Sequence, residues 1–78
     1  MRLHAYYIER EYFDGSADGL IMIWEKDVMA DTRAEMAARD MMRGNNYIER
    51  LCISTDMRTL AEFARRSQTS PMETLYPE

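Results

Sequence analysis

Two apolar segments near the start of the chain decide the fold: LHAYYIEREYF at Leu3 to Phe13, and LIMIW at Leu20 to Trp24. Aromatic and branched side chains, which suit a pleated surface, dominate both segments. Asp14 to Gly19 lies between them and is rich in Gly and Asp, which tolerate the dihedral angles of turns. The pattern predicts an antiparallel hairpin. Neighbours in a strand point to opposite faces, so at least one of Tyr6 and Tyr7 should face outward.

The segment after this hairpin is typical of a helix. Thr32 and Glu35 have the spacing of a capping box, in which each side chain satisfies the backbone N–H of the other residue. Gly44 stands where a left-handed residue commonly ends a helix. An apolar stripe with helical spacing lies between these ends and consists of Ala34, Ala37, Ala38, Met41 and Met42.

The remaining segments predict one more strand and one more helix. Tyr47 to Ser54 is interpreted as a strand, and Met57 to Arg66 as a helix capped by Asp56. The sequence thus predicts a single α+β domain over residues 1–66, with a three-stranded, mainly antiparallel sheet and two helices on one face, in the order ββαβα. Residues 67–78 contain two prolines and several hydroxyl side chains and are expected to form a flexible tail.

Negative charge is concentrated in residues 9–31, which carry seven carboxylates and two cations, a local charge of −5 against −4 for the whole chain. Such a surface repels nucleic acid and attracts a basic protein or a metal ion. We therefore expect a non-enzymatic inhibitor that covers a basic, nucleic-acid-binding surface of a protein partner. This requires the charge to gather on one exposed side. The expected contact residues are Glu9, Glu11, Tyr12, Asp14, Asp18, Glu25 and Asp27.

One alternative is a calcium-binding domain. The segment Asp14 to Glu25 resembles the calcium loop of EF-hands, in which oxygen ligands would come from Asp14, Ser16, Asp18 and Glu25. Met22 stands at the ninth position and offers no oxygen, and the flanking segments are poor helix formers. An acidic hairpin turn is the stronger interpretation, and no metal or cofactor is expected.

A second alternative is a small enzyme or substrate-binding domain that gains its site by dimerising. His4 and Cys52 are each unique in the chain, and a nucleophile pair would need them in contact. In the dimeric alternative, the site would be a pocket lined by His4 and Cys52 from two chains. No other catalytic set stands out, so no enzymatic activity is expected. Residues 1–8 lack the apolar core of a signal peptide, and no apolar run approaches a membrane span. The expectation is a cytoplasmic monomer or homodimer that binds neither membranes nor nucleic acid directly.

In size, acidity and small α+β plan, the chain resembles phage-encoded inhibitors of bacterial defence, of the anti-CRISPR type. The resemblance is one of overall style across the whole chain; no motif carries it, and it transfers no site residue. It implies that the partner is a basic nucleoprotein complex in the cytoplasm of a bacterial host.

Overall fold

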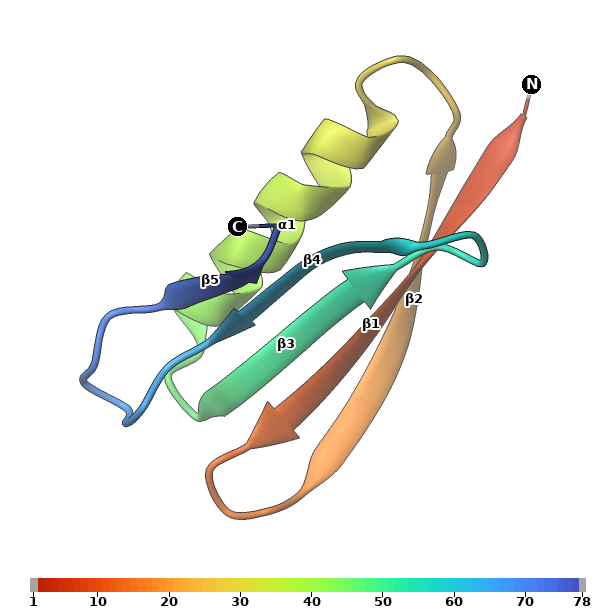
Figure 1. Cartoon of the computed structure of the whole chain (residues 1–78). Helices are drawn as coiled ribbons and strands as arrows, with labels where there is room; N and C mark the ends of the chain where they lie inside the picture. Colours follow the sequence, from red (N-terminus) through yellow and green to blue (C-terminus); the bar gives the residue numbers. More distant parts are fainter. Residues whose placement is uncertain (1, 78) are drawn as a thin grey trace.

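Five antiparallel strands and one helix make up residues 2–77, the part of the chain that the computed structural model describes (Figure 1). The strands lie side by side in the order β2-β1-β3-β4-β5. The helix lies against one face of this sheet, mainly over β3 and β4. We call the other face the open face. The elements are β1 (Leu3–Tyr12), β2 (Ala17–Glu25), α1 (Ala30–Gly44), β3 (Ile48–Ser54), β4 (Thr59–Ala64) and β5 (Glu73–Tyr76).

The predicted hairpin is confirmed, with a shorter turn than expected. Tyr7 pairs with Ile21, and the pairing of β1 with β2 continues without irregularity to Glu11 and Ala17. Gly15 adopts a φ of 89°, a left-handed conformation that costs glycine no steric strain. Its N–H donates to the carbonyl of Tyr12, which closes the turn at 2.9 Å.

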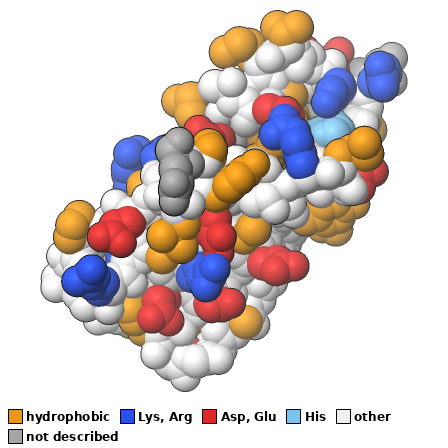
Figure 2. Space-filling view, viewed as in Figure 1, with side chains coloured by type: hydrophobic (Ala, Val, Ile, Leu, Met, Phe, Trp, Pro, Cys, Tyr) orange, Lys and Arg blue, Asp and Glu red, His pale blue; other side chains and the backbone are white. Residues whose placement is uncertain are grey.

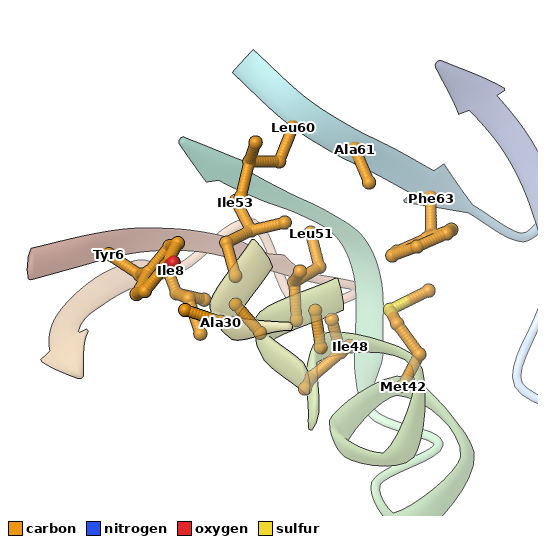
Figure 3. Packing of buried hydrophobic residues seen from close by; sticks show 12 residues of the cluster. Tyr6, Ile8, Ala30, Met42, Ile48, Leu51, Ile53, Leu60, Ala61 and Phe63 are labelled. Atoms are coloured by element: carbon orange, nitrogen blue, oxygen red, sulfur yellow. The ribbon is translucent and has the colours of Figure 1, made fainter. Parts of the chain in front are cut away.

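The hydrophobic core lies between the helix and the sheet (Figure 3). Tyr6 points into it while Tyr7 faces the open side, as alternation requires. On the helix side, Ala30, Ala34 and Ala38 are fully buried. Their small side chains let the helix backbone approach the sheet closely. The largest fully buried side chains are Tyr6, Ile8, Met42, Ile48, Leu51, Ile53 and Phe63.

A β-bulge in β3 allows Ile48 and Leu51 to point into the same core. Glu11 pairs with Arg50, but the next residue of β1 pairs with Ile48, so Glu49 is an extra residue in β3. A bulge of this kind interrupts the alternation of faces by one position. Simple alternation therefore fails to predict which residues of this strand are buried.

The predicted second helix is wrong, because Thr59–Ala64 forms strand β4. Thr55 accepts hydrogen bonds from the backbone N–H groups of Met57 and Arg58 through its hydroxyl oxygen, which makes a tight turn between β3 and β4. Asp56 lies in this turn and caps no helix. The physical reason is Phe63, which is fully buried against the core in the strand.

The C-terminal segment contributes a fifth strand where a tail was expected. β5 pairs with β4 through Phe63 and Thr74, and Met72 packs against the core. The domain therefore has one helix and a five-stranded sheet in the order ββαβββ, in place of two helices and three strands. α1 has 15 residues, and no helix within residues 2–77 has both the length and the apolar character needed to cross a bilayer.

The helix begins two residues earlier than Thr32, and the expected capping box does not form. No side chain caps the helix at Met29. Instead, Asp27 accepts a hydrogen bond from the Met29 N–H at 2.8 Å and forms an ion pair with Arg33 at 2.9 Å. These contacts fix the chain just before the first turn.

The helix ends without the left-handed glycine that the sequence suggests. Gly44 is its last residue, and the following Asn45 is extended. The buried Arg65 guanidinium takes over the capping role. It donates to the carbonyls of Met42, Asn45 and Ile48, which lie at and just beyond the helix end.

Candidate protein-binding surface

The open face carries an apolar patch made by β1 and β2. Its members are cross-strand neighbours, since Tyr7 pairs with Ile21, Ala5 with Ile23, and Leu3 lies two residues before Ala5. Leu3, Ile21 and Ile23 are 65%, 59% and 60% exposed, and Tyr7 is 39% exposed. We define the apolar patch as Leu3, Ala5, Tyr7, Ile21 and Ile23.

Next to the apolar patch, the open face is charged. Glu9 pairs with Cys52 across β1 and β3, and Cys52 pairs with Glu62 across β3 and β4. Arg50 forms an ion pair with Glu62, which raises the pKa of the guanidinium. Glu11 is the cross-strand neighbour of Arg50. We call Glu9, Glu11 and Glu62 the carboxylate cluster; together with Arg50 and Cys52 they line a shallow hollow.

Within residues 2–77, neither Glu9 nor Glu11 forms an ion pair, and both are exposed. Glu25 also points to the open face, at the far end of β2, where it pairs with Leu3. Acidic side chains are seen grouped around a basic one on the visible side of the molecule (Figure 2). The carboxylates of Glu9, Glu11 and Glu25 are therefore available to a partner.

Asp18 lies on the opposite face of the hairpin and is neutralised internally. Arg10 donates two hydrogen bonds to its carboxylate, at 2.8 and 2.7 Å, and the Tyr12 hydroxyl donates a third at 3.0 Å. The guanidinium lowers the pKa of Asp18. Two of the expected contact residues, Tyr12 and Asp18, are thus engaged with each other.

Two further expected carboxylates, Asp14 and Asp27, are also engaged locally. Asp14 accepts hydrogen bonds from the N–H and hydroxyl of Ser16, which lower its pKa. The pKa of Asp27 is lowered chiefly by Arg33. The seven expected contact residues are therefore spread over three places, and the acidic segment does not gather on one exposed side. The open face holds Glu9, Glu11 and Glu25, the hairpin tip holds Tyr12, Asp14 and Asp18, and the start of the helix holds Asp27.

Asp31 belongs to the same acidic segment and links three elements. Its carboxylate accepts hydrogen bonds from the buried Tyr6 hydroxyl and from Arg58, each at 2.7 Å. The Tyr6 hydrogen bond is the main cause of its lowered pKa, and the nearby Arg58 adds to it. Burial and this hydrogen bond raise the pKa of Tyr6 in turn. Asp31 therefore connects α1 with β1 and with the turn before β4.

A shallow hollow of about 460 Å³ lies at the hairpin tip, between β1 and the start of β3. Three aromatic side chains, Tyr12, Phe13 and Tyr47, form its walls together with Asp14, Ser16 and Gln68. Its lining residues come from the end of β1, from the turn and from loops. Only Asp14 among them carries a charge, and its carboxylate is bound by Ser16.

The calcium alternative is not supported by the positions of its ligands. Ala17–Glu25 is a strand, so Asp18 and Glu25 are separated by roughly 23 Å of extended chain. The Asp14 carboxylate is hydrogen-bonded by Ser16, whereas the Asp18 carboxylate is hydrogen-bonded by Arg10. No group of three His, Cys, Asp or Glu side chains within residues 2–77 is arranged to hold a metal ion.

His4 and Cys52 do not meet. His4 lies on the helix side, where its ring contacts Tyr6 edge-to-face at 4.7 Å between centroids. Cys52 lies on the open face as the neighbour of Glu9, and burial raises the pKa of its thiol. A raised pKa disfavours the thiolate, which is the nucleophilic form. The two side chains cannot form a pair within one chain.

Sequence analysis missed the exposed apolar residues and Glu62. The run LIMIW is typical of a central strand, yet β2 is the edge of the sheet, and no element within residues 2–77 covers the open face to which Ile21 and Ile23 point. Glu62 was missed because it was assigned to a helix.

Comparison with protein-family models, with curated proteins and with solved structures found no match for this chain.

Acid should destabilise the fold through these internal ion pairs. The pKa values of Asp18, Asp27 and Asp31 are lowered in the folded state, so the stabilisation is present above the unfolded value of about 3.9 and is lost as the pH falls through the folded values. Urea unfolding followed by circular dichroism should give a nearly constant free energy of unfolding from about pH 7 to pH 5 and a decrease below about pH 4. Arg10→Gln should make that decrease smaller. A free energy of unfolding that does not change on acidification would contradict this assignment.

Proposed function

We propose that this chain is a non-enzymatic protein-binding domain whose open face covers a basic, partly apolar surface of another protein. One observation carries the proposal: exposed apolar side chains and carboxylates without ion pairs among residues 2–77 adjoin each other on the same face. The proposal keeps Glu9, Glu11 and Glu25 from the residues expected on sequence grounds. It adds the apolar patch and Glu62.

The apolar patch supports binding because its members are contiguous. Single exposed apolar residues are common on protein surfaces, whereas a contiguous apolar group with a polar rim is typical of an interaction site. Ile21 lies beside Tyr7 and Ile23 beside Ala5, so a partner would cover them together. A rigid aromatic ring such as Tyr7 is well suited to such a contact.

The charge on the open face favours one kind of partner. Glu9, Glu11, Glu25 and Glu62 outnumber Arg50, which is already paired with Glu62. A second copy placed face to face would bring like charges together, which is unfavourable. Nucleic acid would be repelled as well. A basic protein surface complements the face, and its approach would be accelerated by electrostatic steering.

Binding of this kind would act as inhibition if the partner's basic surface normally holds nucleic-acid phosphates. The carboxylates would then occupy the positions of phosphate groups, and the apolar patch would supply contacts that do not depend on salt. We propose the bacterial cytoplasm as the place of this encounter. The proposal rests on the open face and not on the resemblance to anti-CRISPR inhibitors.

Affinity capture from a bacterial lysate tests the proposal with two variants of the open face. Glu9→Lys with Glu11→Lys reverses the charge, and Ile21→Thr with Ile23→Thr removes apolar area while keeping residues that favour strands. Both variants should lose the same captured proteins, identified by mass spectrometry. For a purified partner, the charge variant should slow association roughly tenfold at low salt and reduce its salt dependence.

The matched control is Asp40→Lys with Asp56→Lys, which changes the net charge by the same amount away from the open face. Both residues are exposed, one on the outer side of α1 and one in the turn between β3 and β4. The control should retain the proteins that the two face variants lose. If all three variants capture the same set as the unchanged chain, the open face is not the binding surface.

A further inference from the structure

We infer that the outer edge of β2 pairs with β2 of a second copy of this chain, which joins two sheets edge to edge. This inference concerns the edge of the sheet and leaves both open faces free. It therefore stands independently of the proposed function.

The two edges of the sheet differ in their protection. Short strands, prolines and bulges normally prevent an edge strand from pairing with another chain. β5 has four residues and lies between Pro71 and Pro77. β2 has nine residues, contains no proline, and pairs with β1 without a bulge. Only the edge formed by β2 is a suitable template for strand addition.

The hydrogen bonds of the hairpin show which backbone groups face this edge. Lys26 N–H donates to Arg2 O at 2.7 Å, and Tyr12 N–H donates to Ser16 O at 2.9 Å. In an antiparallel pair, residues that exchange hydrogen bonds alternate with residues that do not. The even-numbered residues of β2 therefore bond to β1, and the N–H and C=O groups of the odd-numbered residues point outward. These are Ala17, Gly19, Ile21, Ile23 and Glu25.

The strand is complementary to itself in one register. Ile21 is the middle residue of Ala17–Glu25, so a two-fold axis at Ile21 pairs the two strands along their full length. Each Ile23 would then lie opposite Gly19 of the second copy, where the missing side chain leaves room. Each Glu25 would lie opposite Ala17 of the second copy, so no like charges face each other.

Charge is compatible with the same register, although Asp18 is already paired with Arg10. Lys26 is the only lysine of the chain and forms no ion pair within residues 2–77. Continuing the register places it opposite Ser16 of the second copy and diagonal to Asp18 of the second copy. Diagonal neighbours lie about 7–8 Å apart at their Cα atoms, within reach of a long side chain. On the open face, Tyr7 and Ile21 of both copies would form one continuous apolar row.

Sedimentation velocity tests the inference with the full chain and two variants. At about 100 μM the unchanged chain should sediment as a dimer of 9.2 kDa subunits and dissociate on dilution. Ile21→Pro removes an outward N–H and no bond to β1, and a proline is tolerated at such an edge position. Ile21→Lys places like charges opposite each other. Each variant should be a folded monomer by circular dichroism.

A charge-swap experiment tests the register. Ile21→Glu alone should also be monomeric, and mixing it with Ile21→Lys should restore dimers, because opposite charges then meet at the two-fold axis. Amide hydrogen exchange gives a further readout: the N–H groups of Gly19, Ile21 and Ile23 should be at least tenfold more protected in the dimer than in the Ile21→Lys monomer. A monomeric unchanged chain, or dimers of unaltered affinity in Ile21→Lys, would overturn the inference.

Discussion

Arg65→Met should lower the free energy of unfolding by about 3 kcal/mol, a large fraction of what a domain of this size possesses. Arg65 is 8% exposed, and its guanidinium donates hydrogen bonds to the carbonyls of Met42, Asn45 and Ile48. Methionine fills similar space but donates no hydrogen bond, so these carbonyls would lose their donor. Urea unfolding followed by circular dichroism measures the loss.

Arg66→Met is the matched control, because Arg66 is the next residue and is exposed. Its effect should stay within about 0.5 kcal/mol. Arg65→Lys should fall between the two, since an ammonium keeps the charge but cannot reproduce the planar fork of the guanidinium. Equal effects of Arg65→Met and Arg66→Met would show that the buried guanidinium does not stabilise the helix end.

Phe63→Ala should cost about 4 kcal/mol and leave the chain largely unfolded near body temperature. Phe63 is fully buried from β4 and packs under Arg39, whose guanidinium carbon lies 4.7 Å from the ring centroid. Thermal unfolding monitored by circular dichroism is the measurement. The loss follows from removing a large, fully buried ring and leaving a cavity in its place.

Met57→Ala provides the comparison, since Met57 is 84% exposed in the turn before β4. Its effect should stay within about 0.5 kcal/mol. A helix over residues 57–66 would make Met57 part of the buried side, so a large cost at Met57 with a small one at Phe63 would contradict the strand.

The first half of the fold could be predicted because its signals are local. The alternation in Leu3–Tyr12, the turn residues after it and the apolar stripe of α1 each depend on residues close in sequence. The strand predicted over Tyr47 to Ser54 is confirmed as β3. The segment Met57 to Arg66 could not be predicted, because Met57, Leu60, Ala61 and Ala64 have helical spacing by coincidence. What decides this segment is the pairing of Leu51 with Phe63 across β3 and β4, a tertiary contact that overrides local propensity.

The candidate site shows the same division. Charge counting found Glu9 and Glu11 but could not tell them from Asp18, which Arg10 neutralises on the opposite face. Exposure of Ile21 and Ile23 depends on the tertiary arrangement: β2 is at the edge of the sheet, and α1 packs on the opposite face, mainly over β3 and β4. Strand order is set by long-range packing, and no pattern within LIMIW carries it.

The order of the strands also has a consequence for how the chain reaches its native state. Short connections join β1 to β2, β3 to β4, and β4 to β5. The pairing of β1 with β3, by contrast, closes a long loop that contains β2 and α1, as the pair Glu9 and Cys52 shows. Closing a long loop is entropically slow compared with forming a hairpin. During synthesis, the N-terminal hairpin should therefore form before β3 is available. Its core-facing side should stay uncovered until β3 has emerged from the ribosome.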